Sequence, residues 1–302
     1  MSLGIPDSPR VVVQGITGRE AGMVVAQMHA YGTRVAAGVT PGKEGAQVDA
    51  VPVFDTVAAA RADTGGAPFD ISIVYVPPFA ALDAVSEAVE AGIGLLLVVT
   101  ENIPLHDAIR LHAIAREAHA SVIGPNSVGL IVPSRRIKLG AIGGDRPDRA
   151  FVPGRVGVIS RSGGLTAEVG LQLRRRGLGV STAVSIGGDA LIGLEPADVA
   201  RALGDDDETD VIVYVGEPGT SMEERLADAI TSGEITKPVV ALILGEFMED
   251  FPQGTVFGHA GAVIERSQGS PREKKRRLER AGAMVAESLD EAISHVESEV
   301  SR

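Results

Sequence analysis

The sequence lacks cysteine and tryptophan altogether, and aromatic residues make up only 3% of its 302 positions. Without cysteine, the chain can form no disulfide, no thiolate nucleophile and no cysteine-ligated metal site. Its apolar runs are broken well before the roughly 18 residues that a membrane span needs, and its start, MSLGIPDSPR, lacks the apolar centre of a signal peptide. We therefore expect a soluble, cytoplasmic protein that does not contact a membrane.

Positive charge is scarce as well. The net charge of −12 at pH 7 argues against nucleic-acid binding, which needs a broad basic face. One basic run exists, REKKRRLER from Arg272 to Arg280, and acidic residues follow it. This pattern predicts a helix whose charged face is solvated.

Short apolar runs alternate with helical patterns along almost the whole chain. The runs are nearly continuously apolar, which is typical of parallel strands covered on both faces. Such alternation predicts an α/β fold with right-handed βαβ units and mainly parallel sheets. The predicted strands cover residues 10–16, 34–40, 71–77, 94–100 and 121–125, and then 155–161, 181–188, 211–217, 239–246 and 282–287.

A stretch rich in glycine, proline and charge, Leu139 to Arg155, separates the two sets of strands. The same architecture then starts again. We therefore predict two domains, covering residues 1–145 and 146–302.

Ligands of open α/β sheets bind beyond the carboxyl ends of the strands. The first strand is followed by QGITG, a glycine turn that opens a helix whose free N–H groups attract anions. The second strand ends in TPGK instead of the acidic residue that would hold the ribose of NAD, which favours a phosphate. Alternatively, Thr17 and Glu20 form a capping box and the glycines only make the turn. Both interpretations stay open at this point.

The second half contains a similar turn. SRSGG, residues 160–164, follows a strand and opens a helix, so that it offers hydroxyls and backbone N–H groups to a phosphate. Serine–glycine turns are also common as plain connections. Glu217 follows the third strand of this half, where its carboxylate could orient an imidazole or could simply be solvated.

One of the six histidines stands apart. His259 lies in GHAGA among small residues, where a bulky transferable group can approach it. A lone histidine is usually structural, but the absence of a thiol and the presence of two phosphate-like turns suggest a phosphorylated imidazole. The others fall in helix-like stretches and are predicted to be surface or partly buried residues: His29, His106, His112, His119 and His295.

Several segments together resemble a known family. QGITG, VTPGK, IGPN, SRSGGLT, SIGGD, GE and GHAGA, in this order, resemble the α subunit of succinate–CoA ligase (succinyl-CoA synthetase). The resemblance runs from about Val11 to the C-terminal helix. It implies a CoA-binding Rossmann-like domain followed by a flavodoxin-like ligase domain. It also implies a ligase that joins a carboxylate to CoA with cleavage of a nucleoside triphosphate, through a phosphohistidine and an acyl phosphate.

The resemblance assigns roles to individual residues. His259 matches the phosphorylated histidine, and Glu217 matches the glutamate that steadies it. The phosphate and substrate positions implied are Ser160, Ser162, Gly163 and Ala167. The CoA-binding positions implied are Thr17, Gly18, Arg19, Glu20, Lys43, Val99, Thr100 and Glu101.

The resemblance also implies partners. A β subunit of the ATP-grasp type would carry ATP or GTP with its Mg²⁺, and this chain would be inactive alone. The chain itself would then meet CoA, phosphate and a small carboxylic acid, and it would hold no metal ion.

Departures from the family leave alternatives open. Ala167 stands where the family usually has a tyrosine beside the acid, which favours a larger, less polar pocket. Succinate is the default acid, but malate or a bulkier carboxylate stays open. A non-catalytic regulatory protein that binds CoA or a dinucleotide is a different alternative, and the intact His259 and Glu217 argue against it. The altered loop before His259 favours a degenerate member that binds a partner without catalysis.

Overall fold

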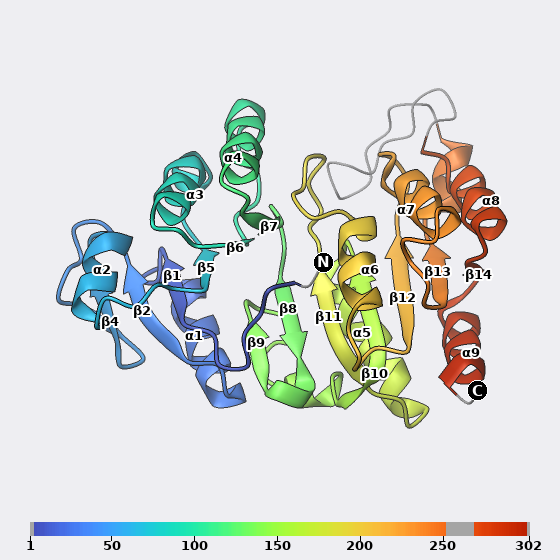
Figure 1. Ribbon diagram of the computed structural model, residues 1–302, viewed down its shortest axis with the longest axis horizontal. Helices are drawn as coiled ribbons and strands as arrows, with labels where there is room; N and C mark the ends of the chain where they lie inside the picture. The colour runs from blue at the N-terminus through green and yellow to red at the C-terminus, as the bar shows by residue number, and fades with distance from the viewer. Residues whose placement is uncertain (1–2, 252–268, 301–302) are drawn as a thin grey trace.

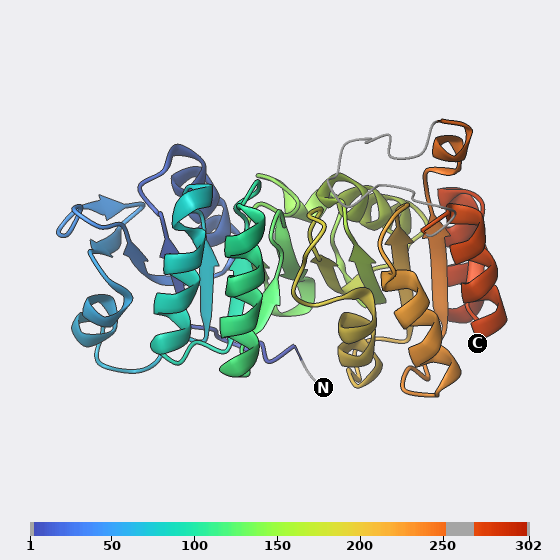
Figure 2. The ribbon, with the colours of Figure 1, turned by 90° about the horizontal axis from the view of Figure 1, so that it is seen from above.

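The computed structural model describes residues 3–251 and 269–300. The chain forms two seven-stranded sheets that lie side by side along the long axis of the molecule (Figure 1). Helices cover both faces of each sheet (Figure 2). The predicted α/β class with two mainly parallel sheets is therefore confirmed.

The first sheet has the strand order β3-β4-β2-β1-β5-β6-β7. All of its pairings are parallel except that of β3 with β4. The chain runs outward from β1 to β2 and β4, and then returns to the other side of β1 with β5. This reversal creates the crevice at which open α/β sheets bind ligands. The strands are β1 (Val11–Gln14), β2 (Val35–Val39), β3 (Gln47–Val48), β4 (Val51–Phe54), β5 (Ile71–Val74), β6 (Leu95–Val98) and β7 (Ser121–Ile123).

The residues of β1 show why these strands read as continuous apolar runs. Val11 and Val13 belong to one buried cluster, whereas Val12 belongs to another. Because successive side chains point to opposite faces, a strand covered on both sides needs an apolar residue at every position. The covering helices are α1 (Arg19–Tyr31), α2 (Val57–Asp63), α3 (Ala81–Glu90) and α4 (Leu105–Glu117), with the 3₁₀ helix η1 (Pro78–Ala80).

The second sheet has the order β14-β13-β12-β10-β11-β8-β9. Its strands from β10 to β14 pair in parallel, and β8 and β9 add an antiparallel edge. The strands are β8 (Gly129–Val132), β9 (Ile137–Leu139), β10 (Pro153–Ser160), β11 (Val180–Ser185), β12 (Val211–Gly216), β13 (Val239–Ile243) and β14 (Met284–Ala286). The helices are η2 (Pro133–Arg135), η3 (Pro147–Arg149), α5 (Gly163–Arg175), α6 (Pro196–Gly204), α7 (Met222–Thr231), η4 (Glu246–Asp250), α8 (Pro271–Ala281) and α9 (Leu289–Val300).

The strands change from one sheet to the other earlier than the expected domain boundary at residue 145. β8 and β9 lie before that residue, yet β8 pairs with β11 of the second sheet. The change therefore falls between Ile123 and Gly129. The glycine- and proline-rich stretch at 139–155 instead connects β9 to β10 within the second sheet. Whether residues 1–145 form a folding unit stays a prediction.

Hydrogen bonds to main-chain groups join the two sheets. The loop after β11 donates from Leu194 N to Val122 O (2.7 Å) and from Gly193 N to Gly124 O (2.9 Å), so it pairs with the end of β7. Elsewhere, Thr33 Oγ1 accepts from Lys138 N at 2.7 Å and donates to Lys138 O at 2.8 Å. These bonds fix the position of each sheet relative to the other.

Gly129 offers a test of this packing. Gly129 has a φ of +106°, and a Cβ added there would lie 1.8 Å from the carbonyl oxygen of Leu139 on the neighbouring strand. Gly92 also has a positive φ, +80°, but an added Cβ there meets no atom within 4 Å. Gly92→Ala should therefore lower the free energy of unfolding only by the cost of placing alanine in the left-handed conformation, about 1–2 kcal/mol. Gly129→Ala should lower the free energy of unfolding by more than about 4 kcal/mol.

The measurement is the midpoint of urea unfolding of both variants, followed by far-ultraviolet circular dichroism. Equal midpoints for Gly92→Ala and Gly129→Ala would contradict the close approach of β8 and β9.

Candidate functional site

The predicted CoA positions lie along one edge of the first sheet. The residues Thr17 to Glu20 follow β1, Lys43 follows β2, and Val99 to Glu101 follow β6. The strands β2, β1, β5 and β6 are neighbours and run in parallel, so their carboxyl ends lie in one row. The fold therefore gathers residues that are far apart in the sequence.

The turn after β1 packs closely against the residue that follows β5, a neighbouring strand in the sheet. Gly15 has a φ of +80°, and an added Cβ would lie 2.9 Å from the carbonyl group of Tyr75. Gly18 is the N-cap of α1, and no side chain within residues 3–251 and 269–300 caps this helix end. The Thr17 hydroxyl instead donates to Thr40 Oγ1 at 3.2 Å. The alternative in which Thr17 and Glu20 form a capping box is therefore wrong, and the first turn of α1 suits an anionic ligand.

The loop that carries Lys43 is held by a residue that the sequence did not single out. One oxygen of Asp55 accepts from the backbone N–H groups of Gly42 (2.7 Å), Lys43 (3.1 Å) and Glu44 (3.2 Å). This contact leaves the Lys43 side chain exposed beside the edge. The only signal in the sequence was an aspartate after a short strand, and nothing there showed that the chain returns to the earlier loop.

The loop after β6 contributes in another way. Thr100 is 9% exposed, and its hydroxyl donates to the carbonyl oxygen of Val76 at 2.8 Å. Thr100 thereby joins the loops after β5 and β6, while Glu101 is exposed. The uncapped helix end, the hydroxyls of Thr17 and Thr40 and the exposed lysine fit a ligand that carries phosphate groups.

In the second sheet, the serine–glycine turn after β10 uses its own hydroxyls to form the turn. Ser160 Oγ accepts from the backbone N–H of Ser162 at 3.1 Å, and Ser162 Oγ caps α5 by accepting from Leu165 N at 3.5 Å. At Gly163, an added Cβ would lie 2.5 Å from the Val128 side chain. The turn therefore places the N-terminus of a thirteen-residue helix at the carboxyl edge of the sheet.

Arg161, between these two serines, is a site residue that the sequence analysis missed. It is 1% exposed, and its guanidinium donates to the carbonyl oxygens of Gly187 (3.3 Å), Gly188 (3.1 Å) and Asp189 (2.8 Å). Its Nη1 atom is buried and has no hydrogen-bond partner among the residues that the structure describes. The motif suggested hydroxyls as the ligands, whereas the structure adds a buried cation with one unused donor group.

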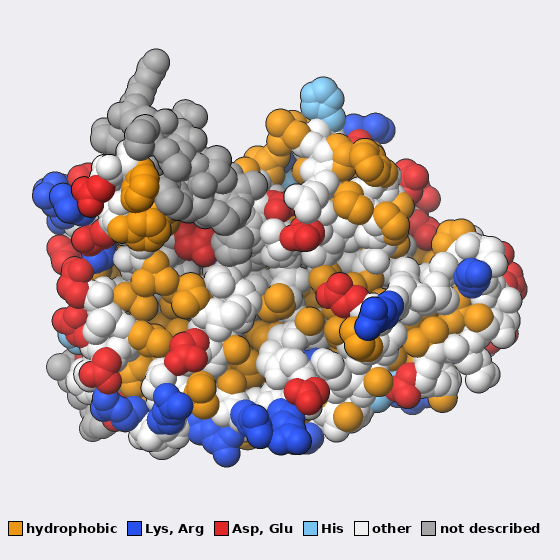
Figure 3. Space-filling model, turned by 180° about the vertical axis from the view of Figure 1, so that it is seen from behind, with side chains coloured by type: hydrophobic (Ala, Val, Ile, Leu, Met, Phe, Trp, Pro, Cys, Tyr) orange, Lys and Arg blue, Asp and Glu red, His pale blue; other side chains and the backbone are white. Residues whose placement is uncertain are grey.

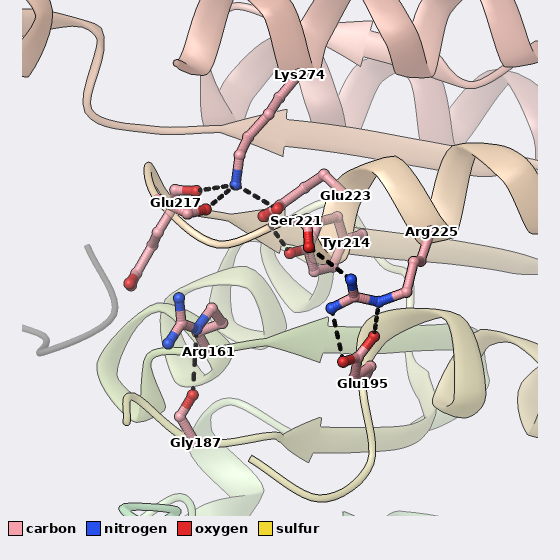
Figure 4. A network of polar contacts seen from close by, with 10 residues as sticks. Arg161, Gly187, Glu195, Tyr214, Glu217, Ser221, Glu223, Arg225 and Lys274 are labelled. Atoms are coloured by element: carbon pink, nitrogen blue, oxygen red, sulfur yellow. Dashed lines mark hydrogen bonds and ion pairs between the residues drawn. The ribbon is translucent and has the colours of Figure 1, made fainter. Parts of the chain in front are cut away.

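Glu217 directly follows β12, the strand that pairs with β10. Its side chain extends toward the Arg161 guanidinium (Figure 4). Burial raises the pKa of the Tyr214 phenol most, and Glu223 raises it further. Arg161 and Glu217 also act on this phenol, since Arg161 lowers its pKa and Glu217 raises it. Ser160, Ser162, Gly163 and Glu217 are therefore brought to the same edge of the second sheet. His259 lies outside the described residues.

The carboxyl ends of the two sheets meet near this edge. Asn126, which follows β7, donates from its side chain to Asp189 Oδ1 at 3.1 Å and from its backbone N–H to Thr100 O at 3.0 Å. Asp189 in turn accepts from Arg161 through its carbonyl oxygen. A continuous set of hydrogen bonds thus runs from the predicted CoA loop at Thr100 to the serine–glycine turn.

Three further expectations have different outcomes. Ala167 is half-buried and packs against the apolar core of the second domain, and the enlarged acid pocket beside it stays a prediction. The solvated basic face at Arg272–Arg280 is wrong in part, because Lys274 is 0% and Lys275 is 7% exposed. All five histidines predicted to be surface or partly buried are exposed or half-buried.

The described residues form neither a metal site nor a membrane-spanning helix. Within residues 3–251 and 269–300, no three histidine, aspartate or glutamate side chains come together in a way that could hold a metal ion. In the same ranges, no helix has the length and apolar character that crossing a bilayer requires. On the back of the molecule, acidic side chains are spread widely and basic ones gather along the lower edge (Figure 3).

Both halves of the chain match known protein families. Residues 7–102 match the family described as the CoA binding domain, and residues 153–298 match the succinyl-CoA ligase like flavodoxin domain. The chain is 44% identical over 292 residues to subunit alpha 1 of the ADP-forming succinate–CoA ligase of Archaeoglobus fulgidus, which covers 97% of this chain and 96% of the relative. It is 43% identical over 291 residues to the corresponding alpha subunit of Aquifex aeolicus, which covers 95% and 91%.

Comparison with solved structures shows the same fold in a larger protein. The ATP citrate lyase of Methanothrix soehngenii, solved in complex with citrate and coenzyme A, superposes with a TM-score of 0.87 at 24% identity. The match covers 96% of this chain and 49% of that one, so the chain spans about half the length of the lyase.

The three tyrosines of the chain give a test of their own burial. Burial raises the pKa of Tyr31 to about 12 and raises the pKa of Tyr75 and Tyr214 above the ordinary value of 10.0. The unfolded chain loses these protons near pH 10, whereas the folded chain keeps them. We expect the free energy of unfolding to be unaffected below pH 10 and to fall as the pH rises from 10 toward 12.

The measurement is phenolate absorbance, which is free of tryptophan signal because the chain has none. Between pH 10 and 12, folded protein should show much less phenolate than protein unfolded in urea, which should give the full signal of the tyrosines. A folded-state titration centred on pH 10 would show that the phenols are solvated.

Proposed function

Because this chain belongs to the family of succinate–CoA ligase α subunits, we propose that it is the α subunit of a carboxylate–CoA ligase that forms a nucleoside diphosphate. The observation that carries the proposal is the identity of 44% over 97% of the chain, with both family domains in their order. Succinate is the default acid and ADP the default product, since these are the names of the relatives. Malate or a bulkier carboxylate remains the alternative.

In the proposed reaction, the γ-phosphate of ATP or GTP passes to the imidazole of His259, and the nucleoside diphosphate leaves. A carboxylate oxygen of the acid then attacks the phosphorus, which frees the imidazole and gives an acyl phosphate. The CoA thiolate attacks the acyl carbon, and inorganic phosphate leaves with the electrons of the broken C–O bond. Each step transfers one group, so the histidine returns to its starting form.

Two features of the second domain suit these steps. The Glu217 carboxylate would accept the N–H of the His259 ring, which leaves the lone pair of the other ring nitrogen free for the phosphoryl group. The N-terminus of α5 and the unused Nη1 donor of Arg161 supply positive charge beside Glu217, where a phosphoryl group would need it.

The first domain would bind CoA along the edge formed by Thr17–Glu20, Lys43 and Val99–Glu101. The uncapped start of α1 and the Lys43 ammonium would take the phosphate groups. A β subunit of the ATP-grasp type would bring the nucleotide and Mg²⁺, and the chain would not turn over alone. The cytoplasmic location also stays a prediction.

Phosphorylation of His259 tests the proposal. The chain would be purified with its native partner and incubated with Mg·ATP or Mg·GTP, and acid-labile phosphate would be mapped by peptide mass spectrometry. We expect label on His259, absent in His259→Asn, and lost again when CoA and the correct acid are added together.

A complex that binds nucleotide and CoA but takes no label would overturn the phosphohistidine mechanism. It would favour the non-catalytic alternatives, in which the chain binds CoA or a partner without turnover. Label that no tested acid removes would keep the mechanism and show that the acid is a different one.

A further inference from the structure

Three polar side chains are buried together beneath the loop that carries Glu217. They are Tyr214 on β12, Glu223 on α7 and Lys274 on α8, and none is more than 1% exposed. The Tyr214 hydroxyl donates to Glu223 Oε1 at 2.6 Å, and the other carboxylate oxygen of Glu223 is paired with the Lys274 ammonium. We call these residues the buried triad (Figure 4).

The Lys274 ammonium has two further partners, and both are backbone groups of the loop after β12. It donates to the carbonyl oxygen of Glu217 at 3.0 Å and to that of Gly219. An ammonium group has three donors, so the bond to Glu223 and these two bonds use all of them. Lys274 is therefore fully satisfied, and most of its bonds go to the loop that holds Glu217.

The same loop is packed tightly on both sides. A Cβ added at Gly216 would lie 2.7 Å from Glu223 Oε1, so the carboxylate lies directly against the backbone before Glu217. On the other side, Gly219 N donates to Gly269 O at 2.9 Å, just before α8. A Cβ at Gly269 would lie 2.7 Å from Gly219 Cα. The backbone of Glu217 thus lies between two fixed neighbours.

Stability alone does not account for this arrangement. Removing a lysine and a glutamate from water is costly, and apolar replacements of buried ion pairs are often neutral or stabilising. A buried ion pair that also bonds two specific carbonyl groups does, however, fix the geometry of the backbone that carries them. The Glu217 carboxylate requires such geometry, since an orienting group must lie within hydrogen-bond reach of its imidazole.

We propose that Lys274, held by Glu223 and Tyr214, is a positioning residue that fixes the loop at Glu217–Gly219 and thereby sets the Glu217 carboxylate for its work on His259. This inference rests on the proposed function, in which Glu217 orients the phosphorylated histidine. In this proposal Lys274 acts through the loop, by its bonds to the carbonyl oxygens of Glu217 and Gly219.

A double-mutant cycle tests the proposal in the complex with the native partner. The variant Lys274→Met/Glu223→Gln removes both charges together, so that no unpaired buried charge remains. Its rate constant for His259 phosphorylation at saturating Mg·ATP would be measured in the wild-type and in the Glu217→Gln background. We expect a loss of about 10-fold or more in the wild-type background, the size found when the partners that orient metal-bound histidines are removed, and little further loss in the Glu217→Gln background.

The matched control is Lys138→Met. Lys138 on β9 is also 0% exposed, and its ammonium donates to Gln27 Oε1 at 3.2 Å, at the other end of the same sheet. This variant loses a buried lysine but leaves the Glu217 loop intact. It should phosphorylate His259 at the wild-type rate, and the apparent affinity for Mg·ATP should be unchanged in both variants.

A second measurement does not depend on the chemistry. Hydrogen exchange of the peptide that contains residues 216–222 should be faster in Lys274→Met/Glu223→Gln than in the wild type, and unchanged in Lys138→Met. Unchanged exchange in the first variant would overturn the positioning role of Lys274, whatever the activity.

The rate of His259 phosphorylation decides whether the buried triad acts through Glu217. In each background, the rate constant without Lys274→Met/Glu223→Gln is divided by the rate constant with it. If this ratio in the Glu217→Gln background exceeds half of its value in the wild-type background, the buried triad does not act through Glu217. Absence of any loss in the wild-type background would also overturn the proposal. Absence of label on His259 in the wild type would instead overturn the proposed function, and the exchange measurement would still decide whether Lys274 fixes the loop.

Discussion

The loop that follows β11 is hydrogen-bonded to the end of β7, and this contact brings the carboxyl edges of two separate sheets together. Leu194 N donates to Val122 O and Gly193 N donates to Gly124 O, so that main-chain bonds join this loop to the end of the first sheet. Because each sheet places its ligand-binding loops at its carboxyl edge, joining the edges is what puts the proposed CoA-binding surface beside the serine–glycine turn. Asn126, between them, bonds to both.

Buried positively charged side chains hold two loops of the candidate site. The chain is acidic overall, with a net charge of −12, yet several cations lie in its interior. Arg161 bonds three backbone carbonyl groups, and Lys274 bonds two. A buried cation that binds carbonyl oxygens holds loops that have no regular partner, because each carbonyl would otherwise lack a donor. In this protein both loops lie at the carboxyl edge where the proposed chemistry takes place.

Most of the regular structure could be predicted from local pattern. Each predicted strand is present, because a strand covered on both faces must be apolar at every position, as Val11, Val12 and Val13 illustrate. The strands that escaped prediction are short and lie at a sheet edge or next to it: β3, β4, β8 and β9. Their pairing depends on tertiary neighbours. For the same reason, the sequence placed the change of sheet at the glycine-rich stretch around residue 145 and not before Gly129.

The sequence by itself determined the α/β architecture and the loops that carry chemistry, since these depend on hydrophobic period and on turn residues next to each strand. It also carried the family resemblance through short motifs such as SRSGG and GHAGA. Only the tertiary structure decided which distant residues hold those loops. Asp55 bonds the Lys43 loop and Lys274 bonds the Glu217 loop, although Lys274 belongs to a run that reads as solvated. The charge of a residue is local information, whereas its burial depends on the elements that pack around it.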